Sequence, residues 1–240
     1  MENLMNYNIY DQEVENINLR TNRIINTINP HSYCMAKKDS HFQNVLKNSD
    51  ILLPDGIGIV MASKVLKGKK IKRITGYDLF IFIMNNLNQI GGSCFFMGSS
   101  NKTLKLIEDR VKKDFKNVEV HSYSPPFKKV FSEEDNGLII NEVNKYKPTV
   151  LFVGMTAPKQ EKWAYDHKDK LNVETICSIG AVFDFYAGTI KRSNPFWIKM
   201  GLEWLPRFLR EPKRLAERNL VSTPKFILEV LSFKLRGVGL

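Results

Sequence analysis

Six apolar runs alternate with amphipathic segments along the first 180 residues, and this alternation restricts the fold more than any other feature. The runs cover residues 23–29, 50–54, 93–98, 118–123, 149–155 and 174–180. Apolar residues recur at helical spacing in four segments between them, residues 31–48, 76–90, 101–115 and 133–146. Strands that alternate with helices predict an α/β fold of the Rossmann-like kind, with a parallel or mixed sheet and helices on both faces.

The character of the sequence changes near residue 192. From there, short helical segments are interrupted by Pro206, Pro212 and Pro224, and Trp, Phe and Leu alternate with Arg and Lys. We therefore predict an α/β core over residues 1–191 and a basic amphipathic helical appendage over residues 192–240.

Positive charge is concentrated in this C-terminal part. The net charge is +11, and residues 191–240 contribute +7 of it through eleven Lys or Arg against four Glu. Such a charge indicates an anionic partner, which is nucleic acid, lipid head groups or a phosphorylated substrate. The appendage combines its charge with Trp197, Trp204 and Phe208, a composition that suits a membrane interface.

The sequence favours a cytoplasmic protein. Apolar runs such as residues 79–84 are too short to span a bilayer, and the polar, acidic N-terminus does not resemble a signal peptide. The three cysteines lie far apart in apolar surroundings, which is typical of free thiols in a reducing compartment.

Asp55 is the first candidate site residue, because it follows an apolar run in the segment LLPDGIGIV. Pro-Asp-Gly suits a tight turn, and that interpretation is the plain alternative. In an α/β sheet, however, ligands bind beyond the carboxyl ends of the strands. Gly98 and Gly154 also follow strands directly, so all three residues are expected at one rim of the sheet.

Other polar residues are predicted near the same rim. Thr27 and Asn29 lie two residues apart at a strand end, and therefore on one side of it. Arg73 and Asp78 belong to the segment KRITGYDL. Each of these residues has a structural alternative, as a helix cap, a turn residue or a solvated cation.

A second group follows the strand over residues 149–155. Lys159 and Gln160 fall in the first turn of a helix that begins at Pro158, where a cation and exposed N–H groups suit a nucleotide-sugar diphosphate. Asp184 is expected to be buried among aromatic residues, where it needs a polar partner. The sequence has no D-x-D triplet for a divalent metal, so basic side chains and helix N-termini would have to neutralise a diphosphate.

In their order along the chain, these segments resemble the WecG/TagA/CpsF family of bacterial glycosyltransferases. The resemblance covers about residues 23–220 and rests on six segments: T-x-N at Thr27 and Asn29, LLPDGIGIV, KRITGYDL, FVGMTAPKQEKW, GAVFDFYAGTIKR and GLEWLPRFLREPKR. It implies an inverting, metal-independent transfer of an N-acetylhexosamine, usually N-acetylmannosamine, from a UDP-sugar. The implied acceptor is GlcNAc on undecaprenyl diphosphate, in the synthesis of cell-surface polysaccharide or teichoic acid.

The resemblance also implies roles for individual residues. Asp55 corresponds to the proposed catalytic base, and four residues to polar positions of the active site: Thr27, Asn29, Arg73 and Gln160. Four arginines correspond to an appendage that docks on the membrane and closes the site: Arg207, Arg210, Arg214 and Arg218. No cofactor is implied. The protein would act at the inner face of the cell membrane, without a nucleic-acid partner, and self-association remains open.

Two other functions compete with this one. A basic α/β module that binds nucleic acid would explain the charge without catalysis. A Rossmann-type oxidoreductase would share the fold, although the G-x-G-x-x-G fingerprint is absent.

Overall fold

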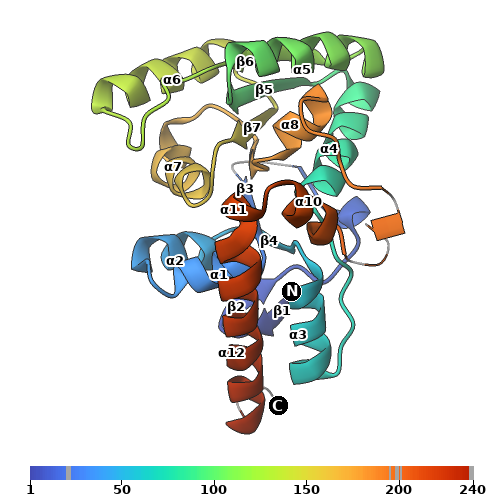
Figure 1. The fold of residues 1–240 in the computed structure, drawn as a ribbon. Helices are drawn as coiled ribbons and strands as arrows, with labels where there is room; N and C mark the ends of the chain where they lie inside the picture. The colour runs from blue at the N-terminus through green and yellow to red at the C-terminus, as the bar shows by residue number, and fades with distance from the viewer. Residues whose placement is uncertain (20–22, 195, 198–199, 201, 238–240) are drawn as a thin grey trace.

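The computed structural model describes residues 1–19, 23–194, 196–197, 200 and 202–237, and its centre is a parallel sheet of six strands (Figure 1). The strands lie in the order β4-β3-β8-β7-β5-β6. Their bounds are β3 (Arg23–Ile28), β4 (Ile51–Pro54), β5 (Ser93–Gly98), β6 (Glu119–Tyr123), β7 (Val150–Gly154) and β8 (Thr175–Ser178). The predicted α/β fold is confirmed, and the sheet is parallel rather than mixed.

Helices cover both faces of the sheet. On one face lie α4 (Gly76–Ile90), α5 (Asn101–Asp114) and α8 (Val182–Ala187). Their apolar sides enclose aromatic rings such as Phe80 and Phe152, whose centroids are 5.3 Å apart. The other face is covered by α1 (Pro30–Ala36), α2 (Ser40–Lys47), α3 (Ile57–Lys67), α6 (Glu133–Tyr146) and α7 (Lys159–His167).

Local signals in the sequence fix several helix ends. Thr75 and Asp78 form a capping box that begins α4, and Ser132 and Asp135 form another that begins α6. In each box the two residues satisfy backbone N–H groups that the first turn leaves without partners. The bounds of α4 and α6 therefore coincide with the predicted segments.

Three features differ from the prediction. The segment 31–48 forms two helices, because Asp39 caps α2 by accepting a hydrogen bond from the Phe42 amide at 3.0 Å. Helix α3 was not predicted. Neither was an antiparallel hairpin of β1 (Glu2–Leu4) and β2 (Tyr7–Ile9). Short 3-10 turns η1 (Val14–Asn16) and η2 (Lys168–Lys170) complete the core.

The C-terminal part is helical, as expected. It comprises α10 (Trp204–Arg210), α11 (Pro212–Ala216), a π-helical segment η3 (Glu217–Ser222) and α12 (Thr223–Leu235). Helix α12 packs on α1 and α3, and its Phe226 ring meets Tyr33 edge-on at 5.2 Å. Among the described residues, no helix combines the length and apolar character needed to cross a bilayer. The division of the chain at residue 192 stays a prediction.

Candidate active site at the carboxyl edge of the sheet

The ends of β3 and β4 bring Asp55 next to Asn29. The two strands pair in parallel up to Ile28 and Pro54, and the Asp55 amide donates to the Ile28 carbonyl at 2.9 Å. The following Gly56 has φ +118°, and a Cβ atom there would lie 3.6 Å from the Cβ of Asn29. The Asp-Gly turn thus passes directly beside Asn29 and places the half-buried carboxylate of Asp55 at the rim. Thr27 lies on β3, two residues before Asn29.

Asn29 and Asp78 both act as helix caps. The Asn29 Oδ1 atom accepts hydrogen bonds from the amides of His31 and Ser32, at 3.0 and 3.1 Å. The Asp78 Oδ2 atom accepts from the amide and hydroxyl of Thr75, at 2.9 and 2.7 Å. The structural alternatives for these two residues are therefore realised, and their contact with a substrate stays a prediction.

Arg73 lies beside the end of β4, because the amide of the next residue, Ile74, donates to the Pro54 carbonyl at 3.1 Å. The Arg73 Nη2 atom is 3.8 Å from a carboxylate oxygen of Glu203, and Arg192 Nε is 3.6 Å from the other oxygen. Glu203 thus lies between two cations near the rim, and its contact with Arg73 connects the C-terminal part to the end of β4. Sequence reasoning gave Glu203 no role, and its place in the GLEW segment was the only available signal.

Gln160 is held firmly under the rim. Its Oε1 atom accepts a hydrogen bond from the Met155 amide at 3.2 Å, and its Nε2 atom donates to Glu161 Oε1 at 2.9 Å. A Cβ atom on Gly180, just after β8, would lie 3.4 Å from Gln160 Oε1. Gln160 therefore bridges the ends of β7 and β8, as a residue that shapes a binding site would.

Glu161, which the sequence analysis did not single out, is 3% exposed. Its Oε2 atom has no hydrogen-bond partner among the described residues, and burial raises the pKa of its carboxyl to about 7. Asn26 Oδ1 and Ser178 Oγ are likewise buried without a partner within that part of the chain. Both lie on the sheet face that α7 covers, because side chains alternate along a strand and Ile24 and Ile176 pack there with Trp163.

Two further candidates face other parts of the molecule. The Lys159 ammonium donates to the Lys128 carbonyl at 2.5 Å and lies 3.4 Å from the centroid of the Phe131 ring. Burial lowers the pKa of the Lys159 ammonium.

The prediction that Asp184 is buried was wrong, since its side chain is half-buried and accepts a hydrogen bond from the Thr189 hydroxyl at 3.3 Å. The reason is that Phe183 and Tyr186 of α8 point into the core while Asp184 does not.

Gly98 and Gly154 are required by close packing. Gly98 has φ +121°, and a Cβ atom there would lie 2.4 Å from the Gly154 carbonyl oxygen. A Cβ atom on Gly154 would lie 2.4 Å from the Phe183 ring. These glycines therefore allow β5, β7 and α8 to meet at the rim, and any contact with a substrate stays a prediction.

Of the four appendage arginines, only the side chain of Arg218 is described, and those of Arg207, Arg210 and Arg214 lie outside the described residues. Burial and, to a smaller extent, the charge of Arg218 lower the pKa of His31. The His31 Nδ1 atom is also 2.9 Å from the hydroxyl of Ser222. Segment η3 is thereby attached to the first turn of α1, immediately after Asn29.

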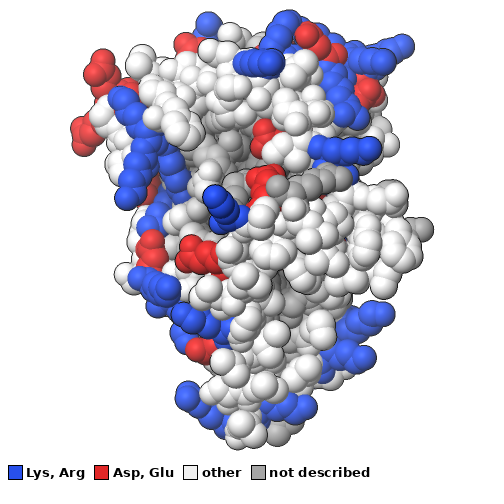
Figure 2. Space-filling view, in the orientation of Figure 1, with Lys and Arg blue, Asp and Glu red and all other residues white. Residues whose placement is uncertain are grey.

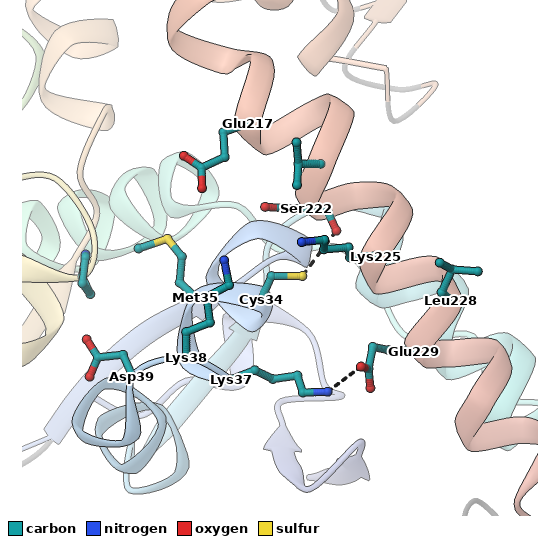
Figure 3. A pocket seen from close by; sticks show the side chains of 12 residues that line it. Cys34, Met35, Lys37, Lys38, Asp39, Glu217, Ser222, Lys225, Leu228 and Glu229 are labelled. Carbon is teal, nitrogen blue, oxygen red and sulfur yellow. Dashed lines mark hydrogen bonds and ion pairs between the residues drawn. The ribbon is translucent and has the colours of Figure 1, made fainter.

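A cavity of about 590 Å³ lies between the end of α1 with the following residues 37–39 on one side and η3 and α12 on the other (Figure 3). Its charged lining residues are three lysines and three acids, of which Lys37 pairs with Glu229. Of the acids, Asp39 pairs with Lys162, outside the lining. Among the described residues, no three His, Cys, Asp or Glu side chains are grouped as metal ligands.

Fold and site together define a class of protein. A parallel α/β sheet that gathers a carboxylate, amides and arginines at its carboxyl edge is typical of enzymes that bind nucleotide-containing ligands there. Comparison with known families is more specific. The chain belongs to the glycosyl transferase WecG/TagA/CpsF family, whose model matches residues 3–238. It is a glycosyltransferase, and neither the nucleic-acid module nor the oxidoreductase is favoured.

Several relatives carry a more detailed name, N-acetylglucosaminyldiphosphoundecaprenol N-acetyl-beta-D-mannosaminyltransferase. One from Bacillus spizizenii strain W23 is 32% identical over 85% of this chain and 77% of its own length. One from Bacillus subtilis strain 168 is 28% identical over 90% of this chain and 81% of its own. One from Staphylococcus aureus strain MW2 is 26% identical over 93% and 87%, respectively.

Proposed function

We propose that this glycosyltransferase transfers N-acetyl-D-mannosamine from UDP to GlcNAc carried on undecaprenyl diphosphate, in the synthesis of a cell-surface polysaccharide or teichoic acid. The names of the relatives support this acceptor and this sugar. The observation that carries the proposal is the placement of Asp55 beside Asn29 at the ends of β3 and β4, with Arg73 on the adjoining segment.

In this mechanism, Asp55 acts as the base. Its carboxylate takes the proton of the acceptor hydroxyl while that oxygen forms a bond to the anomeric carbon of the donor sugar. The bond between the anomeric carbon and the diphosphate breaks from the opposite side, so the configuration inverts and UDP leaves with the electron pair. Gly56 has no side chain, which lets a sugar approach the backbone next to Asp55.

Cations offset the charge of the departing UDP. Arg73 and Arg192 both lie beside the carboxylate of Glu203, so two guanidinium groups are held close to the rim. Arg218 of η3 lies close enough to His31 for its charge to lower the pKa of that imidazole. Fixed cations aimed at developing negative charge lower the barrier, as a metal ion would. We therefore propose that the enzyme needs no metal.

Residues 192–240 are proposed to dock on the inner face of the cell membrane, where the lipid-linked acceptor lies. Arg207, Arg210 and Arg214 would contribute to docking or to closing the site, together with Arg218. Each basic residue near an anionic leaflet contributes about 1 kcal/mol to binding, an effect that salt weakens.

The test is a transfer assay with purified full-length protein. UDP release is measured with UDP-N-acetylmannosamine or UDP-N-acetylglucosamine as donor and a lipid-diphosphate-GlcNAc acceptor, with and without EDTA. We expect release only with the first donor, unchanged by EDTA, and a β-linked product by NMR. Release that is strictly dependent on Mg²⁺ or Mn²⁺, or a preference for the second donor, would contradict the proposal.

A further inference from the structure

Helix α3 exposes an apolar stripe although it belongs to the core. Ile57, Met61 and Val65 follow one another at intervals of four residues and are 37, 59 and 38% exposed. The opposite side of the helix, including Ile59 and Leu66, is buried. Residues four apart share one side of a helix, so the three exposed side chains form a continuous line along α3. Nothing in the catalytic site requires apolar side chains there.

Helix α12 has a similar stripe. Phe226 and Val230 are buried against the core, whereas four apolar side chains on the outer side of the helix are exposed: Ile227, Leu228, Leu231 and Leu235. Leu228 and Leu235 are the most exposed of these, at 66 and 88%. The helix is therefore apolar on both its inner and its outer side, which is unusual for a helix that faces only water.

The two stripes adjoin each other. A Cβ atom on Gly58 of α3 would lie 3.7 Å from the Phe226 ring of α12, so α12 covers the side of α3 that carries Gly58. Met61 and Val65 follow Gly58 by three and seven residues, which places them on that same side, at the margin of the contact. Figure 1 shows α12 and α3 next to each other at the end of the molecule away from α5 and α6.

Basic residues flank the joined stripes. Exposed cations accompany them on both helices: Lys64 and Lys67 on α3, and Lys225, Lys234 and Arg236 at α12. In the same region the carboxylate of Glu229 is paired with Lys37. Figure 2 shows an uncharged area in the middle of this end of the molecule, with Lys and Arg atoms at both sides and at the tip. An apolar strip between cations complements the acyl boundary and the head groups of an anionic bilayer.

We propose that α3 and α12 together form the surface that contacts the bilayer, so that the membrane-binding surface includes the core and is not confined to residues 192–240. This inference rests on the proposed function, because it assumes an acceptor in an anionic membrane. It also explains the position of the base. Helix α3 begins two residues after Asp55, so a bilayer against α3 brings the rim to the level of the head groups, where the acceptor diphosphate lies.

Vesicle co-sedimentation of the full-length protein tests this surface. The variant Met61→Asp with Val65→Asp places two charges on the α3 stripe without touching the site. Its matched control is Leu106→Asp with Leu138→Asp, on exposed positions of α5 and α6. With vesicles of phosphatidylcholine and phosphatidylglycerol, we expect the α3 variant to bind about tenfold or more weakly than wild type, and the control to bind like wild type. Equal binding of the α3 variant and wild type would overturn the proposal.

A second variant separates electrostatic from apolar contributions. Lys64→Gln with Lys67→Gln should weaken binding about fivefold for each lysine at low salt, and only when the vesicles contain phosphatidylglycerol. Thermal melting of every variant checks that the fold is intact, and Met61→Gln with Val65→Thr replaces the double aspartate if it is not. Loss of self-association in the α3 variant, with vesicle binding unchanged, would identify the surface as an interface between copies and overturn the proposal.

Transfer assays distinguish failure of this inference from failure of the proposed function. The α3 variant should keep wild-type activity on a water-soluble GlcNAc-diphosphate acceptor and lose activity on the lipid-linked acceptor in vesicles. Wild-type protein that binds vesicles through α3 but transfers sugar to neither acceptor would contradict the proposed function alone. An α3 variant that is fully active on the lipid-linked acceptor would contradict the role of α3 alone.

Discussion

Replacing Glu161 with glutamine tests whether a buried carboxyl group beneath the site is kept neutral. One oxygen of Glu161 accepts a hydrogen bond from Gln160, and the other has no partner among the described residues. Burial removes the water that would stabilise an ionised carboxylate in this position, and this raises the pKa of Glu161 from 4.5 to about 7. Glutamine keeps the acceptor for Gln160 and carries donors in place of the acid proton, so it imitates the protonated form.

The expected effect on stability follows from proton binding. The unfolded chain loses this proton near pH 4.5, whereas the folded protein retains it until about pH 7. Raising the pH through this interval therefore destabilises the folded wild type. A change of pKa of this size corresponds to about 3 kcal/mol in the free energy of unfolding, fully lost above about pH 7. Glu161→Gln removes this dependence, so its stability relative to wild type should rise by up to that amount.

Urea unfolding at a series of pH values between about 4.5 and 8 measures the difference, because other titrating groups cancel between the two proteins. Leu138→Gln, on an exposed position of α6, is the control, and its difference from wild type should not change with pH. If the difference between Glu161→Gln and wild type is also constant over this range, the carboxylate is charged and stabilised in the folded protein, and the reasoning is refuted.

Three further substitutions give simpler outcomes. Asp55→Asn should lower turnover by about 10² to 10⁴-fold without weakening UDP binding measured by calorimetry, and wild-type turnover would exclude Asp55 as the base. Glu203→Gln should lower kcat/KM by about tenfold, because the charge-assisted contacts that hold Arg73 and Arg192 are weakened; an unchanged pH–rate profile and kcat/KM would show that this ion pair does not position the site. Gly154→Ala should destabilise the fold by about 1 to 3 kcal/mol in urea unfolding, since its Cβ would overlap the Phe183 ring, and equal stability would mean that the ring moves away freely.

The elements that the sequence predicts well are those with local signals. Helices α4 and α6 begin at capping boxes formed by residues three apart, Thr75 with Asp78 and Ser132 with Asp135. The β1–β2 hairpin has only short strands, and it depends on contacts far along the chain, such as the hydrogen bond from the Tyr10 amide to the Leu52 carbonyl. Patterns within a short window do not contain such contacts.

The candidate site shows the same difference between features with local sequence signals and features that depend on distant residues. Asp55 was predictable at a strand end, because the order of strands and glycines specifies the rim of a parallel sheet. The partners that orient the site were not. Glu203 meets Arg73 across the fold, and the buried state of Glu161 depends on how α7 packs on β3 and β8. Asp184 was misjudged for a related reason, since neighbouring aromatic residues in a sequence need not surround a side chain in space.

The packing of α12 has a consequence for anyone who wishes to produce a soluble, tail-free enzyme. Phe226 fills space between Tyr33 of α1 and Gly58 of α3, the helices that follow Asn29 and Asp55. A shortened protein that ends before α12 would expose an apolar groove directly behind Asn29 and Asp55. This exposed surface would promote aggregation and would make the candidate site less rigid. Redesign of the outward-facing leucines of α12, with the whole chain retained, is the safer route to such a reagent.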